Sequence, residues 1–327
     1  IALVRDCDIF VVAPATANVI AKIANGGADD MLSAAALAAR VPIVVAPAMN
    51  SAMYEHEAMQ TNLGMLRRRG VTIVDPERGY LAEGERGIGR LAHEDVILHA
   101  IESVLDRARS LQGERVLITA GPTREAIDPV RFLSNASTGS MGIALAAEAI
   151  ARGASVELVL GPTSLDTPEA ADVERVTTAQ EMYDAVMRRF GRASIMIACA
   201  AVADWRPRAT FEHKVKKTEE VSAIEVERTP DILGAVGARK KDLFLVGFAA
   251  ETERHEEHAR EKIVRKNLDA IALNDVGTPG SGFGTGENEV TLLWGTDGTA
   301  PLGRAGKTEL ARRMWTELES LLRERVR

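Results

Sequence analysis

The sequence has little cysteine and few aromatic residues. Cys7 and Cys199 are its two cysteines among 327 residues, and aromatic residues make up 4%. Two distant cysteines cannot form the disulfide framework of a small secreted protein, and neither lies in a metal-ligand cluster, so we expect a reducing cytoplasm as the setting. No apolar run approaches the roughly 20 residues that a membrane-spanning helix needs, so we expect no membrane partner.

An excess of positive charge is also missing. The net charge is −7, and neither the part before residue 110 nor the part after it is basic. We therefore expect no nucleic-acid partner. With 46% hydrophobic residues, a chain of 327 residues is long for a single core, and two domains are expected.

Both parts of the chain alternate short apolar runs with helical patterns, which predicts an α/β fold with parallel sheets. We place the first domain at residues 1–110 and the second at residues 111–327, where the strands and crossover helices suit a Rossmann-like sheet. A charged segment at residues 206–229 predicts an arm that projects from this sheet. The expected strands are residues 8–13, 42–46, 71–74, 115–119, 155–160, 194–198, 244–247, 270–273 and 290–294.

The first domain has fewer strands than a doubly wound sheet usually has. The chain begins at Ile1, without methionine and almost directly in an apolar strand. A small subdomain packed on the second domain is one interpretation. Because a three-stranded parallel sheet would expose an edge and apolar surface, we expect instead an incomplete sheet whose front part lies outside this sequence.

Residues suited to an anion follow the strand that ends at Thr119. Small residues at 138–142 begin a helix, and free backbone N–H groups at a helix start favour phosphate or carboxylate. A plain capped helix start would look similar. The loop before it contains Arg131 and Asn135, which could hold an anion by bidentate and amide hydrogen bonds.

Other polar residues are expected near the same sheet edge. Asp204 follows a strand at the edge where open α/β sheets bind ligands, with turn capping as the alternative. Several lysines could converge there and neutralise a triphosphate, although solvated lysines are the simpler interpretation of each pair. They are Lys214, Lys216, Lys217, Lys262 and Lys266. In the first domain, residues 13–18 and 47–53 follow strands and suit a cofactor edge, and glycine-rich residues 79–90 predict a mobile flap.

Eight strings in order resemble the family of bifunctional coenzyme A biosynthesis proteins, in which a phosphopantothenoylcysteine decarboxylase is fused to a phosphopantothenate–cysteine ligase. The resemblance runs over nearly the whole chain and implies a flavodoxin-like first domain. The strings are APATAN (13–18), PAMNSAMY (47–54), ITAGPTREAIDPVRFLSNASTGSMG (118–142), ACAAVADWRP (198–207), KVKK (214–217), TPDIL (229–233), GFAAET (247–252) and KNLDAIALND (266–275).

For the second domain, the resemblance implies a ligase that activates 4′-phosphopantothenate with CTP as an acyl-cytidylate, after which the amine of L-cysteine displaces CMP. Mg²⁺ is expected on the triphosphate. Lys214 resembles the lid lysine for cytidylate formation, and Asn135, helped by Arg131, resembles the residue of the second step. The implied CTP-binding residues are Lys214, Ala200, Asp204, Pro230, Asp231, Ile232, Leu233, Phe248, Lys262 and Lys266.

For the first domain, the resemblance implies the C-terminal part of an FMN-dependent decarboxylase. Asn50 would hold the substrate carboxylate, and Thr16, Asn18 and Met49 would border FMN. The family's catalytic histidine would stand directly before Ile1. Glu83 occupies the place of the usual flap cysteine, and a carboxylate cannot replace a thiol in redox steps. We therefore predict that this chain does not decarboxylate phosphopantothenoylcysteine.

Two alternatives come from other classes of protein. A non-catalytic, flavoprotein-like regulatory subunit is one, and the complete set of ligase lysines argues against it. A nicotinamide dehydrogenase is disfavoured because the sequence has no compact G-x-G-x-x-G turn with an acidic residue at the expected offset. The family's members are homo-oligomeric, and residues 221–228 would suit a dimer contact, so we expect a homo-oligomer.

Overall fold

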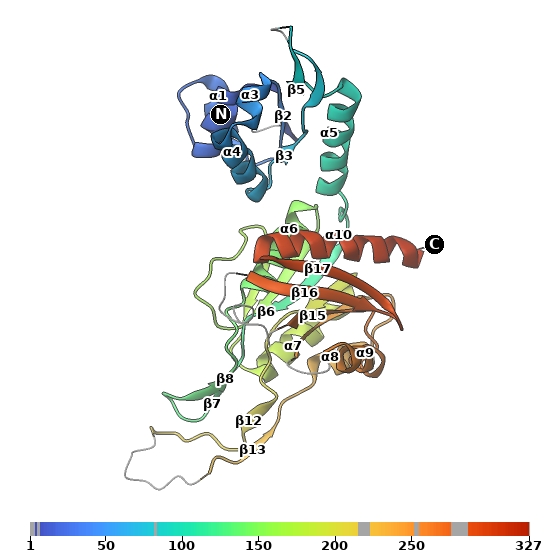
Figure 1. The fold of residues 1–327 in the computed structure, drawn as a ribbon. Helices are drawn as coiled ribbons and strands as arrows, with labels where there is room; N and C mark the ends of the chain where they lie inside the picture. The colour runs from blue at the N-terminus through green and yellow to red at the C-terminus, as the bar shows by residue number, and fades with distance from the viewer. Residues whose placement is uncertain are drawn as a thin grey trace. The chain divides into compact units, whose positions relative to one another are not determined.

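The structure of the protein is a computed structural model that describes residue 4 and residues 7–81, 84–214, 223–251, 255–275 and 287–326. The chain forms two compact units, Ile1–Arg109 and Ser110–Arg327. Both are drawn in Figure 1. Within the described residues, no helix is both long and apolar enough to cross a membrane.

The first unit is built on a three-stranded parallel sheet in the order β1-β2-β3. Val45 points to the side of α1 and α4, and Val44 and Ala46 point to the side of α5. Alternation along a strand thus gives this short sheet two apolar faces, each covered by helix. The elements are β1 (Phe10–Ala15), α1 (Ala17–Asn25), α2 (Met31–Ala38), β2 (Ile43–Pro47), α3 (Ser51–Glu55), α4 (Glu57–Arg68), β3 (Thr72–Ile73) and α5 (Glu94–Ala108).

The segment predicted as a flap contains an antiparallel hairpin of β4 (Glu77–Tyr80) and β5 (Arg86–Arg90). It packs against the turn after β2: the backbone N–H of Met49 donates to the carbonyl of Gly89 at 2.9 Å, and the Ser51 hydroxyl donates to the carbonyl of Ile88 at 2.7 Å. Gly89 has a φ of +138°, and a Cβ there would lie 2.1 Å from the Met49 carbonyl oxygen. Close approach of the hairpin therefore requires glycine at this position. Glu83 lies outside the described residues.

The second unit is built on an eight-stranded sheet in the order β10-β9-β6-β11-β14-β15-β16-β17. The strands from β10 to β15 run parallel, and β16 and β17 are antiparallel. The strands are β6 (Arg115–Ala120), β9 (Ser155–Leu160), β10 (Asp172–Arg175), β11 (Ile195–Ala198), β14 (Phe244–Glu251), β15 (Ala270–Asp275), β16 (Glu287–Trp294) and β17 (Gly298–Gly306).

Helices cover both faces of this sheet, as Figure 1 shows. Val116 and Ile118 of β6 belong to the core beneath α6 and α10, whereas Leu117 belongs to the core beneath α7, α8 and α9. The continuous apolar sequence of β6 is explained by this burial on both sides. The helices are α6 (Ser140–Ala151), α7 (Ala179–Arg189), α8 (Ile232–Gly237), α9 (His255–Arg265) and α10 (Lys307–Val326), with a 3₁₀ turn η2 (Phe190–Arg192).

Two hairpins extend from the second unit. One pairs β7 (Arg124–Ala126) with β8 (Phe132–Ser134), and the other pairs β12 (Trp205–Pro207) with β13 (Val226–Arg228). The predicted fold class, α/β with a parallel sheet in each part and a projecting arm, is confirmed. The sequence also predicts a linker in the polar residues 110–114 between the two domains. Part of this segment belongs to the second unit, because Leu111 is buried in its core and the Leu111 N–H donates to the carbonyl of Arg152 at 2.9 Å.

Candidate active site

The second sheet changes its winding direction between β6 and β11. From β6 the chain continues outward to β9 and β10, and from β11 it continues outward to β14 and β15 on the other side. The loops that leave the two central strands therefore diverge and open a crevice at their carboxyl ends. In open α/β sheets this is the place where ligands bind.

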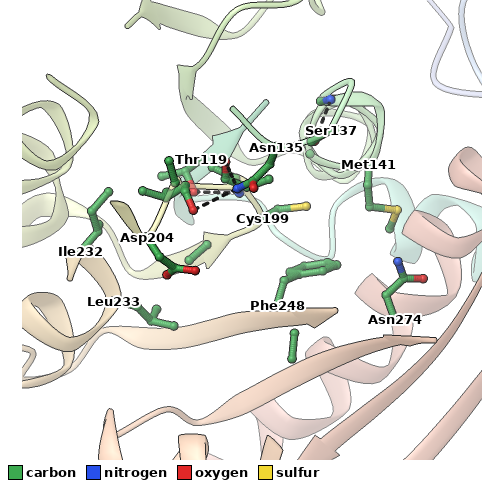
Figure 2. Close-up of a pocket in the computed structure, with 18 of the residues that line it drawn as sticks. Thr119, Asn135, Ser137, Met141, Cys199, Asp204, Ile232, Leu233, Phe248 and Asn274 are labelled. Atoms are coloured by element: carbon green, nitrogen blue, oxygen red, sulfur yellow. Dashed lines mark hydrogen bonds between the residues drawn. The ribbon is translucent and has the colours of Figure 1, made fainter. Parts of the chain in front are cut away.

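A cavity of about 970 Å³ occupies this crevice. Figure 2 shows Asp204, Ile232 and Leu233 at one end, Met141 and Asn274 at the other, and Phe248 between them. The cavity is lined by Thr119, residues 198–205, residues 228–233, the start of α6, and residues from β14, α9, β15, β16 and α10. Segments from most of the second unit thus meet at one site.

Threonine side chains hold the loop after β11 against the loop after β6. The Thr119 hydroxyl oxygen accepts a hydrogen bond from the N–H of Ala200 at 3.2 Å, and the buried Thr123 hydroxyl accepts one from the N–H of Ala203 at 2.9 Å. The N–H of Ala201 donates to the carbonyl of Gly121 at 2.9 Å. The backbone from residue 199 to residue 204 is therefore fixed where it borders the cavity.

The start of α6 forms another wall of the cavity. Its N-cap is Gly139, in the left-handed conformation with φ +83°, and no side chain caps the helix by a hydrogen bond from this position. Gly142 lies directly on β6, because a Cβ there would be 2.4 Å from the Ala120 Cβ. The helix start thus approaches the crevice closely and presents backbone N–H groups where an anion is favoured.

Asn135 bridges two loops at the cavity. Its side-chain amide nitrogen donates to the carbonyl oxygens of Ala201 and Val202, each at 3.1 Å. Figure 2 shows both bonds. Its donor atom is therefore engaged by the protein, whereas the amide oxygen has no partner among the described residues and can accept a hydrogen bond from a ligand.

Asp204 lines the cavity at the end that also contains Ile232 and Leu233 (Figure 2). Its backbone carbonyl accepts from the N–H of Thr229 at 3.1 Å, which joins the loop after β11 to the loop before α8. No hydrogen bond of its carboxylate is found in the described part of the chain. The alternative prediction, that the Asp204 side chain caps a turn, is therefore not what the structure shows.

Three basic residues line the cavity from α9 and the turn that follows it. They are Lys262, Arg265 and Lys266. The Lys266 ammonium lies 2.8 Å from Asp231 Oδ1, and this carboxylate also accepts from the N–H of Gly234 at 2.9 Å. Burial raises the pKa of Asp231, but the hydrogen bonds from Lys266 and Gly234 outweigh it, so the pKa lies below its usual value of 3.8.

The opposite end of the cavity contains Asn274, Asn288 and Lys307, from β15, β16 and the start of α10. The Lys307 ammonium donates to Asn288 Oδ1. Asn274 is opposite Val290 in the β15–β16 ladder, and Asn288 is two residues from Val290, so all three side chains are on the same sheet face. Two asparagines therefore replace apolar residues on an otherwise hydrophobic face.

Comparison with known proteins identifies the chain's relatives. Residues 111–322 match the family described as DNA/pantothenate metabolism flavoprotein C-terminal domain, and residues 1–106 match the family described as Flavoprotein. The coenzyme A biosynthesis bifunctional protein CoaBC of Bacillus subtilis (strain 168) is 49% identical over 290 residues, which are 88% of this chain and 71% of that protein. The chain therefore belongs to the CoaBC family. It is a family of coenzyme A biosynthesis enzymes with flavoprotein and pantothenate-metabolism domains.

Two further CoaBC proteins are similar over large parts of the chain. The CoaBC of Escherichia coli (strain K12) is 44% identical over 291 residues, 88% of this chain and 72% of that protein. A crystal structure of the C-terminal domain of a CoaBC protein is 41% identical and covers 66% of this chain and 99% of the solved chain, with a TM-score of 0.57. The predicted resemblance to this family is confirmed.

Most residues that the CoaBC resemblance assigned to CTP and the ligation step meet in the cavity. They are Asn135, Ala200, Asp204, Pro230, Asp231, Ile232, Leu233, Phe248, Lys262 and Lys266. Two assigned residues do not line it. Arg131 is at the turn of the β7–β8 hairpin, 3.7 Å from Asp128 Oδ2, and Lys214 is an exposed residue beyond β12. Lys216 and Lys217 lie outside the described residues.

The residues assigned to the flavin site follow neighbouring strands of the first unit. Thr16 and Asn18 come after β1, and Met49 and Asn50 come after β2, so they lie at the same sheet edge. The Thr16 hydroxyl accepts from the N–H of Val19 at 3.4 Å, and Asn50 Oδ1 accepts from the N–H of Ala52 at 2.8 Å. Both side chains thus serve as helix caps in this structure.

Sequence reasoning missed the far end of the cavity. Asn274 belongs to one of the family strings, KNLDAIALND, but the sequence does not predict a role for it, for Asn288 or for Lys307. An asparagine on the apolar face of each of two neighbouring strands could have indicated a binding site, because it interrupts that face with a polar group. Lys307 carried no comparable signal, since it comes directly after an antiparallel hairpin that the sequence did not predict.

Proposed function

We propose that the second unit catalyses the CTP-dependent ligation of cysteine to 4′-phosphopantothenate through an acyl-cytidylate. The observation that carries this proposal is the crevice at the β6–β11 switch point. It brings Asn135, Asp204 and the Lys262–Lys266 pair together from three separate parts of the sequence. The family membership supports a role in coenzyme A biosynthesis, and the geometry supports this particular reaction.

The first step joins the substrate carboxylate to the α-phosphorus of CTP and releases pyrophosphate. The nucleotide would occupy the cavity end formed by Asp204, residues 230–233 and Phe248. Asp204 has a carboxylate available to accept from ribose hydroxyls or the cytosine amine. Lys262 and Lys266 lie at the same end, where cationic groups can neutralise the charge that grows on the leaving pyrophosphate.

In the second step, the amine of cysteine attacks the acyl carbon, the bond to the CMP oxygen breaks, and an amide forms. Asn135 would border this reaction, because its donor atom is fixed on the backbone of residues 201 and 202. Its free amide oxygen could accept a hydrogen bond from the incoming ammonium or amine and orient it. An acyl phosphate is already a good electrophile, so orientation is a large part of what the protein must supply.

Lys214 and Arg131 extend this proposal beyond the cavity wall. Lys214 is the last described residue before residue 223 and would assist cytidylate formation as a point charge that approaches the phosphates. Arg131 would help in the second step, and its position on a projecting hairpin is compatible with action in a homo-oligomer. Both roles rest on the family resemblance.

Magnesium would enter this site with the nucleotide. Among the described residues, no group of three or more histidines, cysteines, aspartates or glutamates is arranged to hold a metal ion. A cation held mainly by triphosphate oxygens fits such a donor set, because Mg²⁺ retains waters and needs few protein ligands. Asp204 and Asp231 are carboxylates that line the cavity and could contribute a ligand.

The first unit would serve the decarboxylase chemistry of the family. The residues at its sheet edge are of the chemical types that suit FMN, because a half-buried methionine, Met49, lies next to backbone and amide groups. Thr16, Asn18 and Met49 would hold FMN, and Asn50 would hold the substrate carboxylate. FMN supplies oxidation of the cysteine part of the substrate when it is bound. That this chain does not decarboxylate phosphopantothenoylcysteine stays a prediction, and carbon dioxide release by the purified chain would contradict it.

The ligase proposal is tested by pyrophosphate release from the purified full chain. Release should require both phosphopantothenate and CTP with Mg²⁺, and product should form only when cysteine is added. Lys214→Gln should abolish pyrophosphate release, whereas Asn135→Asp should preserve it and block amide formation. Absence of CTP binding by calorimetry would favour a non-catalytic, flavoprotein-like regulatory subunit instead.

A further inference from the structure

The parallel pairing of β6 with β11 continues into the loops that follow these strands. The N–H of Ala201 donates to the carbonyl of Gly121 at 2.9 Å, and the N–H of Thr123 donates to the carbonyl of Ala201 at 3.3 Å. Pro122 and Ala201 form an isolated parallel bridge between these bonds. The hydrogen-bond pattern of the sheet therefore extends as far as Thr123, beside loop residues that line the cavity.

Thr123 ends this pattern with its side chain. In a continued parallel pair, the N–H of Ala203 would donate to the backbone carbonyl of Thr123, because donors alternate along each strand. It donates instead to the Thr123 hydroxyl oxygen at 2.9 Å, and both residues are buried. The Thr123 carbonyl is therefore available to a different donor, and it accepts from the Ser134 hydroxyl at 2.7 Å.

This exchange of acceptors connects Thr123 to two residues of the candidate site. Ala203 directly precedes Asp204, and Ser134 directly precedes Asn135. The Asn135 amide then returns to the loop after β11, where it donates to two backbone carbonyls at 3.1 Å each. Figure 2 shows Asp204 and Asn135 at the cavity. The hydroxyl and the carbonyl of one buried threonine thus hold the segments that carry both side chains.

We propose that Thr123 is a positioning residue of the ligase reaction that fixes the separation between Asp204 and Asn135, and that Ser134 is a second positioning residue that acts on Asn135. This inference rests on the proposed ligase function, which assigns Asp204 to the nucleotide and Asn135 to the amine of cysteine. The acyl-cytidylate formed beside Asp204 must present its acyl carbon to that amine. Thr123 does not line the cavity, so it acts through these two residues.

Thr123→Val tests the hydroxyl, because valine keeps the shape of the side chain and removes the oxygen that accepts from Ala203. The buried N–H of Ala203 then loses its partner, and the loop that carries Asp204 should shift. We expect kcat/KM for CTP, measured by pyrophosphate release from the full chain, to fall roughly 10- to 100-fold, since displacements of about 1 Å can have effects of this size. Thr123→Ser keeps the hydroxyl and should recover most of the loss.

Ser134→Ala tests the second bond and leaves the hydrogen bond between Thr123 and Ala203 in place. The rate of pyrophosphate release and KM for CTP should stay close to the wild-type values. The rate of amide formation in a single turnover, with the chain in excess over CTP, should fall roughly tenfold because Asn135 is less well oriented. Acyl-cytidylate should therefore accumulate, and chromatography of acid-quenched samples measures it.

Thr178→Val is the matched control for the loss of a threonine hydroxyl. The Thr178 hydroxyl oxygen also accepts from a backbone N–H, that of Glu181 at 3.1 Å, and neither residue lines the cavity. Both valine variants should have a lower melting temperature than the wild type. At a temperature where all chains are folded, only Thr123→Val should have a lower kcat/KM for CTP. An equal effect of the two variants on this constant would show that Thr123 has a structural role alone.

Other results would also overturn the proposal. A loss in Thr123→Ser as large as that in Thr123→Val would show that the hydroxyl does not position the loop. Ser134 is exposed, so Ser134→Ala tests the proposal even if Thr123→Val does not fold. Unchanged amide formation in Ser134→Ala, or an equal fall in both of its rates, would contradict the assigned role.

Failure of the proposed ligase function can be distinguished from failure of the positioning role. If the wild type releases no pyrophosphate, the ligase function fails, and calorimetric titration with CTP then decides the role of Thr123. Thr123→Val must bind CTP more weakly than both the wild type and Thr178→Val. Equal affinities, or no binding of CTP by the wild type, would overturn the positioning role.

Discussion

Lys266 and Asp231 form an ion pair at the nucleotide end of the cavity, with 2.8 Å between Nζ and Oδ1. The same carboxylate caps α8 by accepting from the N–H of Gly234. Asp231 thereby fixes the position of both a helix start and a lysine that we assign to the phosphates. A bound phosphate would compete with this carboxylate for Lys266. We therefore expect Lys266 to contact Asp231 when the nucleotide is absent and a phosphate when it is bound.

Replacing Asp231 by asparagine should separate these two roles. Asparagine keeps the cap but removes the charge, so Asp231→Asn should lower the melting temperature at pH 7 by about 1–3 °C, as for a half-exposed ion pair. Because the folded pKa of Asp231 is below its usual value of 3.8, its stabilisation is present above that pH and is lost as pH falls through the folded pKa. Thermal unfolding monitored from pH 7 to pH 3 should therefore show the difference in melting temperature between variant and wild type begin to decrease as the pH falls below 3.8. A constant difference would contradict this assignment.

Close packing of α6 on β6 should be sensitive to a single methyl group. A Cβ at Gly142 would lie 2.4 Å from the Ala120 Cβ and 3.3 Å from the Thr119 carbonyl oxygen, neither of which can move freely. Gly142→Ala should destabilise the second unit by about 1–3 kcal/mol and weaken phosphate binding at the helix start. Urea unfolding measures the first effect and CTP titration the second. Gly191→Ala is the matched control, since nothing lies within 4 Å of a Cβ there.

Much of this fold could be predicted from the sequence, and the exceptions have physical causes. The buried parallel strands such as β6 have continuous apolar sequences and were placed nearly to the residue. β10 was missed because three of the four residues in this edge strand, Asp172–Arg175, are charged and it has no apolar run. β17 was missed because it contains Pro301 and three glycines. An edge strand tolerates these residues, but in a sequence they indicate a loop.

The same causes explain which part of the site was predicted. Asp204 follows a buried parallel strand, and residues 230–233 resemble a family string, so sequence reasoning reached them. Lys307 directly follows β17, and the antiparallel pairing of β17 with β16 brings it to the cavity. The local sequence does not show that this hairpin returns the chain to the crevice. The hairpin that carries Arg131 likewise lay in a segment predicted to be a loop.

Cys199 should be unreactive although it lines the cavity. Burial raises the pKa of its thiol to about 12, so almost none of it is thiolate at pH 8. Alkylation of Cys199 by iodoacetamide at pH 8 should be roughly a thousandfold slower in the folded chain than in the denatured chain. Peptide mass spectrometry resolves Cys199 from Cys7. Rapid labelling of Cys199 in the folded chain would show instead an activated thiol and would require a new interpretation of this wall.

The attachment of α10 to α6 should depend on one buried arginine. Arg152 is 1% exposed and lies 2.8 Å from a carboxylate oxygen of both Glu148 and Glu319. Arg152→Met would leave Glu319 buried without its main counter-charge and should destabilise the second unit by about 3–5 kcal/mol in urea unfolding. Adding Glu319→Gln should recover part of this loss, because the unpaired charge is then removed.

Arg208→Met, which breaks an exposed ion pair with Glu225, is the control and should cost at most about 1 kcal/mol of unfolding free energy. Equal stability losses in Arg152→Met and Arg208→Met would refute the anchoring role of the buried pair.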